Sequence, residues 1–103
     1  MISDEKVAEL KAKHSDLTLL KAGSFEIVVR PPTREEWKRF RKEASDDAKK
    51  SDSVEGILRA CTVYPDASEV VSMLAKKPAL AEKFGKEVLE LAAGVEEVEK
   101  KAL

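Results

Sequence analysis

From residue 17 onward, the apolar residues change their spacing once, at residues 30–33. Before this point they alternate with polar residues, as in strands with one buried face. After it they recur every three or four residues, as on one side of a helix. Pro31 and Pro32 lack amide hydrogens and have a fixed φ, so neither a β-ladder nor a helix continues through them. The pattern predicts an α+β fold that is mostly α.

The first 30 residues predict a helix followed by a β-hairpin. Residues 1–16 hold the helix, from Asp4 to about Lys13, because Ser3 is a good N-cap residue just before it. Residues 17–30 hold two alternating runs joined at Gly23, a residue that easily adopts the positive φ of a tight turn. One face of this hairpin is predicted to pack on the core. Its apolar residues are Leu17, Leu19, Phe25, Ile27 and Val29.

About four helices are predicted after the diproline, forming a helical core over residues 33–93. Thr33 is the expected N-cap of the first, and Glu36, three residues later, completes the pattern of a capping box. This helix is expected to run to about Asp47, with Trp37 as its buried anchor. The other three helices are expected over residues 53–63, 67–75 and 78–93.

The last helix has the most regular pattern in the chain. Its apolar residues are separated alternately by three and four positions, which is the spacing of a coiled-coil seam. Gly94 interrupts the pattern, so the helix either ends near Ala93 or continues as a projecting C-terminal helix over residues 94–103. A projecting seam would be a partner-binding surface, whereas the alternative for its first three residues is packing in the core. The candidate partner-binding residues are Phe84, Val88, Leu91, Val95 and Val98.

Composition narrows the class of protein. The 103 residues are enough for one domain, residues 1–103, and 38% charged with 5% aromatic residues is typical of a small helical protein with solvated faces. One cysteine excludes an internal disulfide and fits a reducing cytoplasm. The N-terminus lacks the features of a secretion signal, and the apolar runs are shorter than the ~20 residues that span a bilayer. We therefore expect a cytoplasmic protein without a membrane partner.

The sequence contains no pattern that indicates catalysis, a metal site or a cofactor. His14 has no neighbouring metal ligands and no nucleophile at motif spacing. Cys61 falls on an apolar stripe with Ile57 and Leu58, which is typical of a thiol buried in a core. The four glycines are scattered, so there is no phosphate-binding loop. We expect a protein that is not an enzyme.

A cluster of basic residues surrounds the start of the first helix after the diproline. Such a cluster can contact phosphate groups, and the helices that follow could imitate a helix-turn-helix. It is interleaved with Glu35, Glu36 and Glu43, however, and the net charge of −1 gives no broad basic field. A small DNA-binding regulator using the helix after Thr33 is therefore an alternative interpretation. The basic residues are Arg30, Arg34, Lys38, Arg39, Arg41 and Lys42.

Three segments in a fixed order resemble a known family. The first is the end of the hairpin with its diproline, Val28 to Thr33, followed by Glu36 and Arg41. The second is Leu58 to Asp66, which contains Cys-Thr-Val-Tyr-Pro. The third is Leu74 with Lys-Pro-Ala-Leu at 77–80, then Phe84 to Ala92. Over roughly residues 17–93 this order is similar to the small tail assembly chaperones of long-tailed bacteriophages and prophages, although Thr62 interrupts their cysteine–valine pair.

The resemblance implies a non-enzymatic role. Such chaperones keep the long tape measure protein soluble while tail tube subunits assemble around it, and they are absent from the finished virion. It therefore implies the tape measure protein as the main partner, the tail tube protein as a second one, and action in the bacterial host cytoplasm without nucleic acid. Self-association stays open. A bacterial adaptor unrelated to phage is the remaining alternative.

Overall fold

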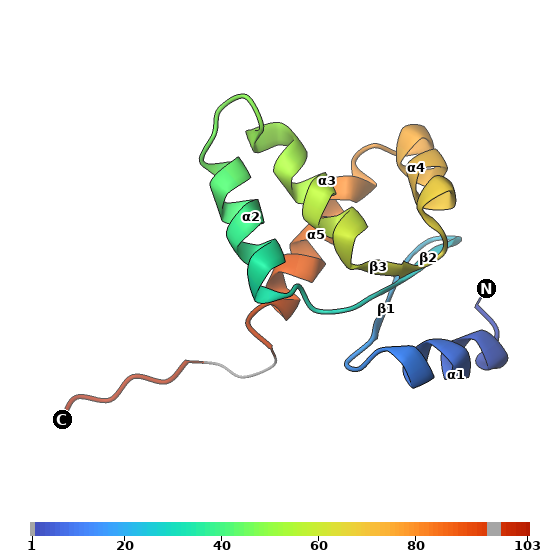
Figure 1. Ribbon diagram of the computed structural model, residues 1–103, viewed down its shortest axis with the longest axis horizontal. Coiled ribbons are helices and arrows are strands. Elements are labelled where there is room, and N and C mark those ends of the chain that lie inside the picture. Colours follow the sequence, from blue (N-terminus) through green and yellow to red (C-terminus); the bar gives the residue numbers. More distant parts are fainter. Residues whose placement is uncertain (1, 95–97) are drawn as a thin grey trace.

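The computed structural model describes residues 2–94 and 98–103 (Figure 1). It confirms a mostly helical α+β fold, in which an N-terminal helix and a hairpin precede four further helices. The elements are α1 Asp4–Lys13, β1 Thr18–Ala22, β2 Phe25–Val29, α2 Arg34–Ala44, α3 Lys50–Cys61, β3 Thr62–Tyr64, α4 Ala67–Lys76 and α5 Leu80–Leu91.

The sheet has three antiparallel strands in the order β1-β2-β3. Gly23 forms the expected hairpin turn with a φ of 61°. The third strand was not predicted, because the sequence favoured a helix through residue 63. Instead α3 ends at Cys61, and the chain extends so that Tyr64 pairs with Val28. The pairing joins residues far apart in sequence, which periodicity cannot reveal.

The predicted inner face of the hairpin is wrong by one residue in β1. Leu20 pairs with Ile27, and Thr18 pairs with Val29, so Leu20 shares the core face with these two β2 residues. Leu19 lies on the opposite face with 51% of its surface exposed. The two-residue turn fixes the register of the hairpin. Because side chains alternate between the two faces of a strand, a shift of one residue places each side chain on the opposite face.

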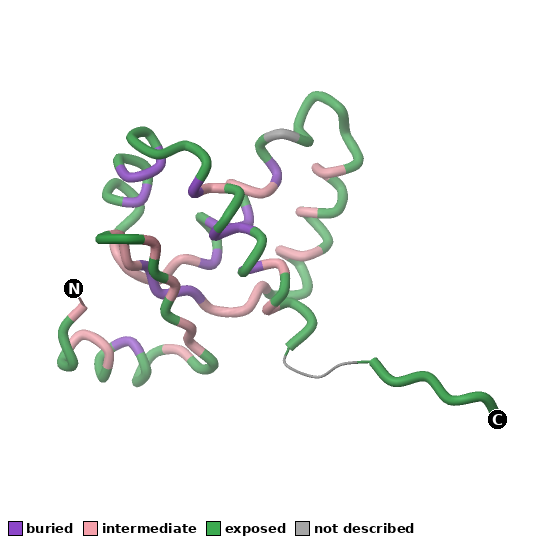
Figure 2. Tube along the Cα trace, turned by 180° about the vertical axis from the view of Figure 1, so that it is seen from behind, coloured by how far each residue is buried: buried purple, intermediate pink, exposed green. Residues whose placement is uncertain are grey.

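The core lies between this sheet face and the helices α3, α4 and α5. Ile27 and Val29 of β2 meet Leu58 of α3, Val70 of α4 and Val88 of α5, all essentially inaccessible to solvent. Figure 2 shows most of the buried segments on these elements, with one more on α1 and none on α2. On the other side of the hairpin lies α1, capped as expected by Ser3, whose hydroxyl accepts from the Lys6 amide.

The capping box of α2 is confirmed, but its anchor is not. The Thr33 hydroxyl accepts from the Glu36 amide, and the Glu36 carboxylate accepts from the Thr33 amide. The helix ends at Ala44, earlier than expected. No residue of α2 is fully buried, and Trp37 is half-buried against the edge of the core beside Phe40, with ring centroids 5.6 Å apart.

The helix boundaries near the C-terminus also differ from expectation. The start of α5 is Leu80, two residues after Pro78, and its end is Leu91. Gly94 has a φ of 74°, which is incompatible with a continuing right-handed helix. Residues 98–103 are not helical, and residues 95–97 lie outside the described residues. Of the two alternatives, the end of α5 at Leu91 agrees with a helix that stops near Ala93. Within the described part of the chain, no helix is long and apolar enough to cross a bilayer.

Candidate partner-binding groove

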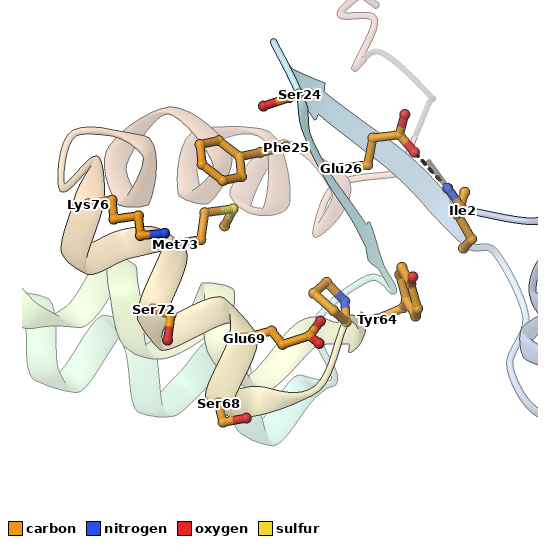
Figure 3. Close-up of a pocket in the computed structure, with 11 residues that line it drawn as sticks. Ile2, Ser24, Phe25, Glu26, Tyr64, Ser68, Glu69, Ser72, Met73 and Lys76 are labelled. Carbon is orange, nitrogen blue, oxygen red and sulfur yellow. Dashed lines mark hydrogen bonds between the residues drawn. The ribbon is translucent and has the colours of Figure 1, made fainter.

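The cleft between the hairpin and α4 has a volume of about 390 Å³ (Figure 3). Two of its polar side chains, Glu26 and Ser68, have local hydrogen-bond partners. The Glu26 carboxylate accepts from the Ile2 amide at 3.1 Å, and the Ser68 hydroxyl donates to Asp66 at 2.8 Å. Glu69 and Lys76 come from separate turns of α4. Glu69, Ser72 and Lys76 are spaced along one side of α4, and no hydrogen bond within the described part of the chain joins their side chains.

Neither residue that the sequence singled out for chemistry lies in a reactive setting. His14 is the C-cap of α1, where its amide donates to the Leu10 carbonyl. Cys61 is fully buried, and this burial, with the nearby negative charge of Glu36, raises the pKa of its thiol to about 11. A buried, protonated thiol is unreactive. Among the described residues, no group of three His, Cys, Asp or Glu side chains is arranged to hold a metal ion.

Another depression lies between the N-terminal turn of α2 and the C-terminal end of α5. It has a volume of about 410 Å³, and its floor is formed by the half-buried Trp37 and Leu89. The exposed Ala92 and Ala93 line the α5 side. Small side chains let another backbone approach closely, and an exposed aromatic surface provides contact area. We call this depression the α2–α5 groove; it is lined by Pro32, Thr33, Arg34, Trp37, Leu89, Ala92 and Ala93.

An ion pair holds α2, and with it the groove, in place. The guanidinium of Arg30, at the end of β2, donates to both carboxylate oxygens of Glu36, at 2.7 and 2.8 Å. It also donates to the Ala60 carbonyl of α3 at 2.9 Å, and the Arg30 amide donates to the Cys61 carbonyl at 3.0 Å. One arginine thus connects the sheet to both α2 and α3.

The hydrogen bonds from Arg30 lower the pKa of Glu36 from its ordinary value of 4.5 to about 2. Desolvation opposes this change, and the Thr33 amide and hydroxyl add to it. Arg30 responds in the opposite sense, since Glu36 raises its pKa. Both side chains are about a quarter exposed, at 25% and 23%. Glu36 is therefore ionised throughout the range in which most proteins are studied.

The low pKa of Glu36 predicts acid sensitivity. A carboxylate with a depressed folded-state pKa stabilises the fold fully above its unfolded-state value, and this contribution is lost as the pH falls through the folded-state value. We expect a loss of about 2 kcal/mol between about pH 5 and about pH 2, reduced from the full shift because solvent reaches the pair. Urea unfolding across this range measures it. The variant Glu36→Gln should lack this component, and a profile identical to that of the wild type would contradict the assignment.

The structure separates the residues that the seam pattern had grouped. Phe84 is 4% exposed and Val88 is fully buried, which favours the core alternative for both. Leu91 is half-buried and packs against the core, whereas Val98 is 97% exposed. Val95 lies outside the described residues. The predicted seam contains none of the residues that line the groove. Leu89 and Ala92 are next to seam positions in the sequence but do not belong to the seam.

The structure divides the basic cluster into residues that form ion pairs and residues that do not. Arg30 is paired with Glu36, and Arg39 donates to Glu43 at 3.1 Å. The other four basic residues are exposed, and no ion pair between described residues involves them. They are Arg34, Lys38, Arg41 and Lys42.

Comparisons with known proteins support the fold. No family model matches the chain, and no curated protein matches it. Among solved structures, the chain is similar to the uncharacterised protein rbstp2171 from Bacillus stearothermophilus, with a TM-score of 0.75 and 18% sequence identity. The similarity covers 92% of this chain and 99% of that chain. At this level of identity it shows a shared fold.

Proposed function

We propose that this chain is a tail assembly chaperone of a long-tailed phage or prophage. It binds the tape measure protein without catalysing a reaction and keeps it soluble while the tail tube assembles. It acts in the host cytoplasm and is absent from the mature virion. The tail tube protein is a second partner in this proposal.

The observation that carries the proposal is the α2–α5 groove. A tape measure protein is a long, largely helical chain with apolar seams, and a chaperone must cover such seams reversibly. Trp37 and Leu89 offer an apolar floor that is only half-covered by the fold itself. An amphipathic helix can lay its apolar side into such a groove. The three sequence segments that resemble tail assembly chaperones support the same role.

One observation favours a second function, a small DNA-binding regulator. The four exposed basic residues of α2 are placed on one helix, and a basic helix face is a common contact for phosphate groups. DNA binding by this route would weaken steeply with rising salt. A bacterial adaptor with a different protein partner is the third candidate.

Co-expression with the tape measure protein tests the proposal. Under the proposal, the tape measure protein is encoded by a very long helical reading frame just downstream of this chain's gene, and that protein is the probe. Its soluble fraction and its co-purification with this chain are measured. We expect the wild-type chain to raise the soluble fraction, and Ala92→Arg to abolish co-purification because the long charged side chain fills the groove. The matched control is Ala75→Arg, the same change at an exposed position of α4, which should bind normally.

Two results would decide against parts of the proposal. A tape measure protein that stays insoluble beside the wild-type chain would reject the chaperone function. Normal binding of the tape measure protein by Ala92→Arg would show that the groove is not the binding site. The double variant Val95→Asp/Val98→Asp tests the earlier assignment to the C-terminal segment, and selective loss of binding in that variant would place the contact there.

A further inference from the structure

We propose that the α2–α5 groove is selective for amphipathic helices whose apolar stripe is bordered by acidic side chains. The inference deepens the proposed function and rests on it, because it specifies which segments of a long helical partner would be bound. Three observations carry it: the apolar floor, the distribution of charge along α2, and the path of the C-terminal residues.

The apolar floor suits a helix. Trp37 and Leu89 are half-buried, and Ala92 and Ala93 leave room above them because their side chains end at Cβ. The groove lies between the N-terminal turn of α2 and the C-terminal end of α5. Figure 1 shows these two helix ends next to each other. A third helix can lie across such a pair with its apolar stripe on Trp37. The anchor contact is thus an aromatic ring, the kind of residue that dominates binding energy at protein interfaces.

The charge beside the floor is basic. Arg34 lines the groove, and Lys38 and Arg41 follow it four and seven residues later on one side of α2. Arg34 and Arg41 are the helix neighbours of Trp37, three residues before it and four after it, whereas Lys38 lies further around the helix. We call Arg34, Lys38 and Arg41 the basic stripe. All three are exposed, and no ion pair within the described part of the chain involves them.

Two of the three acidic residues of α2, Glu36 and Glu43, lie away from this stripe. The third, Glu35, is three residues before Lys38 and borders the stripe. Glu36 is held by Arg30, and Glu43 by Arg39 on the side toward α3, while Glu35 is on the outer surface. The chain as a whole has 20 acidic and 19 basic residues, so the basic stripe differs from the average surface. A partner helix seated on Trp37 would place its flanking side chains beside these cations, where carboxylates are attracted and ammonium groups are repelled.

The described end of the chain does not occupy the groove. Val98 and Leu103 are almost fully exposed, and residues 98–103 extend away from the helices in Figure 1. The occupant that we propose is a segment of another protein, with an apolar stripe and a carboxylate border.

Two synthetic helices test the inference on the full chain. Each has roughly 25 residues, long enough to hold helical structure in water, with the same leucine stripe. One carries glutamate beside the stripe, and the other carries lysine. We expect the glutamate helix to bind roughly tenfold more tightly at low salt, with the difference shrinking as salt rises. Fluorescence of Trp37, the only tryptophan of the chain, reports binding at the groove itself.

Charge reversal supplies the matched control. Arg34→Glu/Arg41→Glu should weaken binding of the glutamate helix roughly tenfold and favour the lysine helix. The control Lys42→Glu/Arg59→Glu makes the same change of net charge at exposed positions outside the groove, and should alter affinity less than about twofold. Unfolding midpoints close to the wild-type value would show that the reversed variants remain folded.

Several outcomes would overturn the inference. Equal affinity for the two helices would do so, as would equal effects of the two double variants. Binding of a 20-base-pair DNA duplex through the basic stripe, lost in Arg34→Glu/Arg41→Glu and stronger than binding of the glutamate helix, would assign the stripe to nucleic acid. Concentration-dependent dimerisation abolished by Ala92→Arg would assign the groove to a second copy of this chain.

The two proposals fail separately. If the tape measure protein is solubilised and bound but the synthetic helices bind equally, the selectivity is rejected and the chaperone function stands. If the glutamate helix is preferred but the tape measure protein stays insoluble, the chaperone function is rejected and the selectivity of the groove stands.

Discussion

Replacing Glu36 by alanine is expected to destabilise the fold by about 2–4 kcal/mol. The substitution removes both hydrogen bonds from the Arg30 guanidinium and the side-chain acceptor of the Thr33 amide. It also leaves a largely covered cation with only carbonyl acceptors, Pro31 and Ala60. The pair is about a quarter exposed, so the cost falls below that of a fully buried pair. Such a loss is a large part of the ~5–15 kcal/mol that stabilises a domain.

Urea unfolding of Glu36→Ala and of Glu35→Ala measures this effect against a neighbour. Glu35 is exposed in the same turn of the same helix, and its removal should cost less than about 0.5 kcal/mol. Equal losses in the two variants would mean that the connection through Arg30 contributes little, and that α2 is held by its apolar contacts alone.

Replacing Gly85 by valine is expected to cost about 2–4 kcal/mol, because it forces α5 away from α3. A Cβ built at Gly85 would overlap Cγ1 of Val54 and would lie 3.4 Å from the Val54 carbonyl oxygen. Val54 is short and β-branched, so it has few rotamers with which to move aside. The added methyl groups of valine would deepen the overlap at the contact between α5 and α3.

Gly56→Ala is the matched control for this prediction. Gly56 is also inside a helix, but a Cβ there would meet only the Glu43 Oε2 atom, at an ordinary contact distance of 3.8 Å. Alanine is the better helix former, so this variant should gain about 0.5–1 kcal/mol. Thermal or urea unfolding of both variants gives the comparison. A wild-type midpoint for Gly85→Val would show that the two helices separate without cost.

The parts of the fold that depend on local chemistry were predictable from the sequence. The hydroxyl of Ser3 and the reciprocal hydrogen bonds of Thr33 and Glu36 join residues three apart, so the beginnings of α1 and α2 follow from residue types. Gly23 likewise specifies its own turn. These signals involve only neighbours in sequence, and tertiary contacts did not override them.

The parts that depend on distant contacts were not predictable in the same way. Thr62 to Tyr64 form a strand only because β2 offers hydrogen-bonding groups there. The sequence pattern had placed Thr62 and Val63 at the end of a helix. Leu19 and Leu20 are equally apolar, and the turn geometry decides which one faces the core. Trp37 was expected in the core because tryptophan is large and apolar, but α2 lies at its edge.

The groove could not be predicted from the sequence for a related reason. The 3–4 spacing in the last helix correctly marks an apolar face, and Phe84 and Val88 show that this face points into the core. The spacing of apolar residues cannot distinguish a helix face that is buried in the core from one that binds another protein. The exposed surface that remains is made by residues from two helices, Trp37 and Leu89, whose proximity no linear pattern records.

The insertion of α2 and α3 between β2 and β3 has a consequence for the order of folding. The hairpin of β1 and β2 closes over two residues, whereas β3 reaches β2 only after a chain of about 30 residues is closed, at an entropic cost on the order of 3 kcal/mol. Helices formed early shorten that search, because they reduce the number of flexible residues in the loop. The folding rate of this small protein should therefore be set by the docking of one three-residue strand, with the Arg30 hydrogen bonds to Ala60 and Cys61 made in the same step.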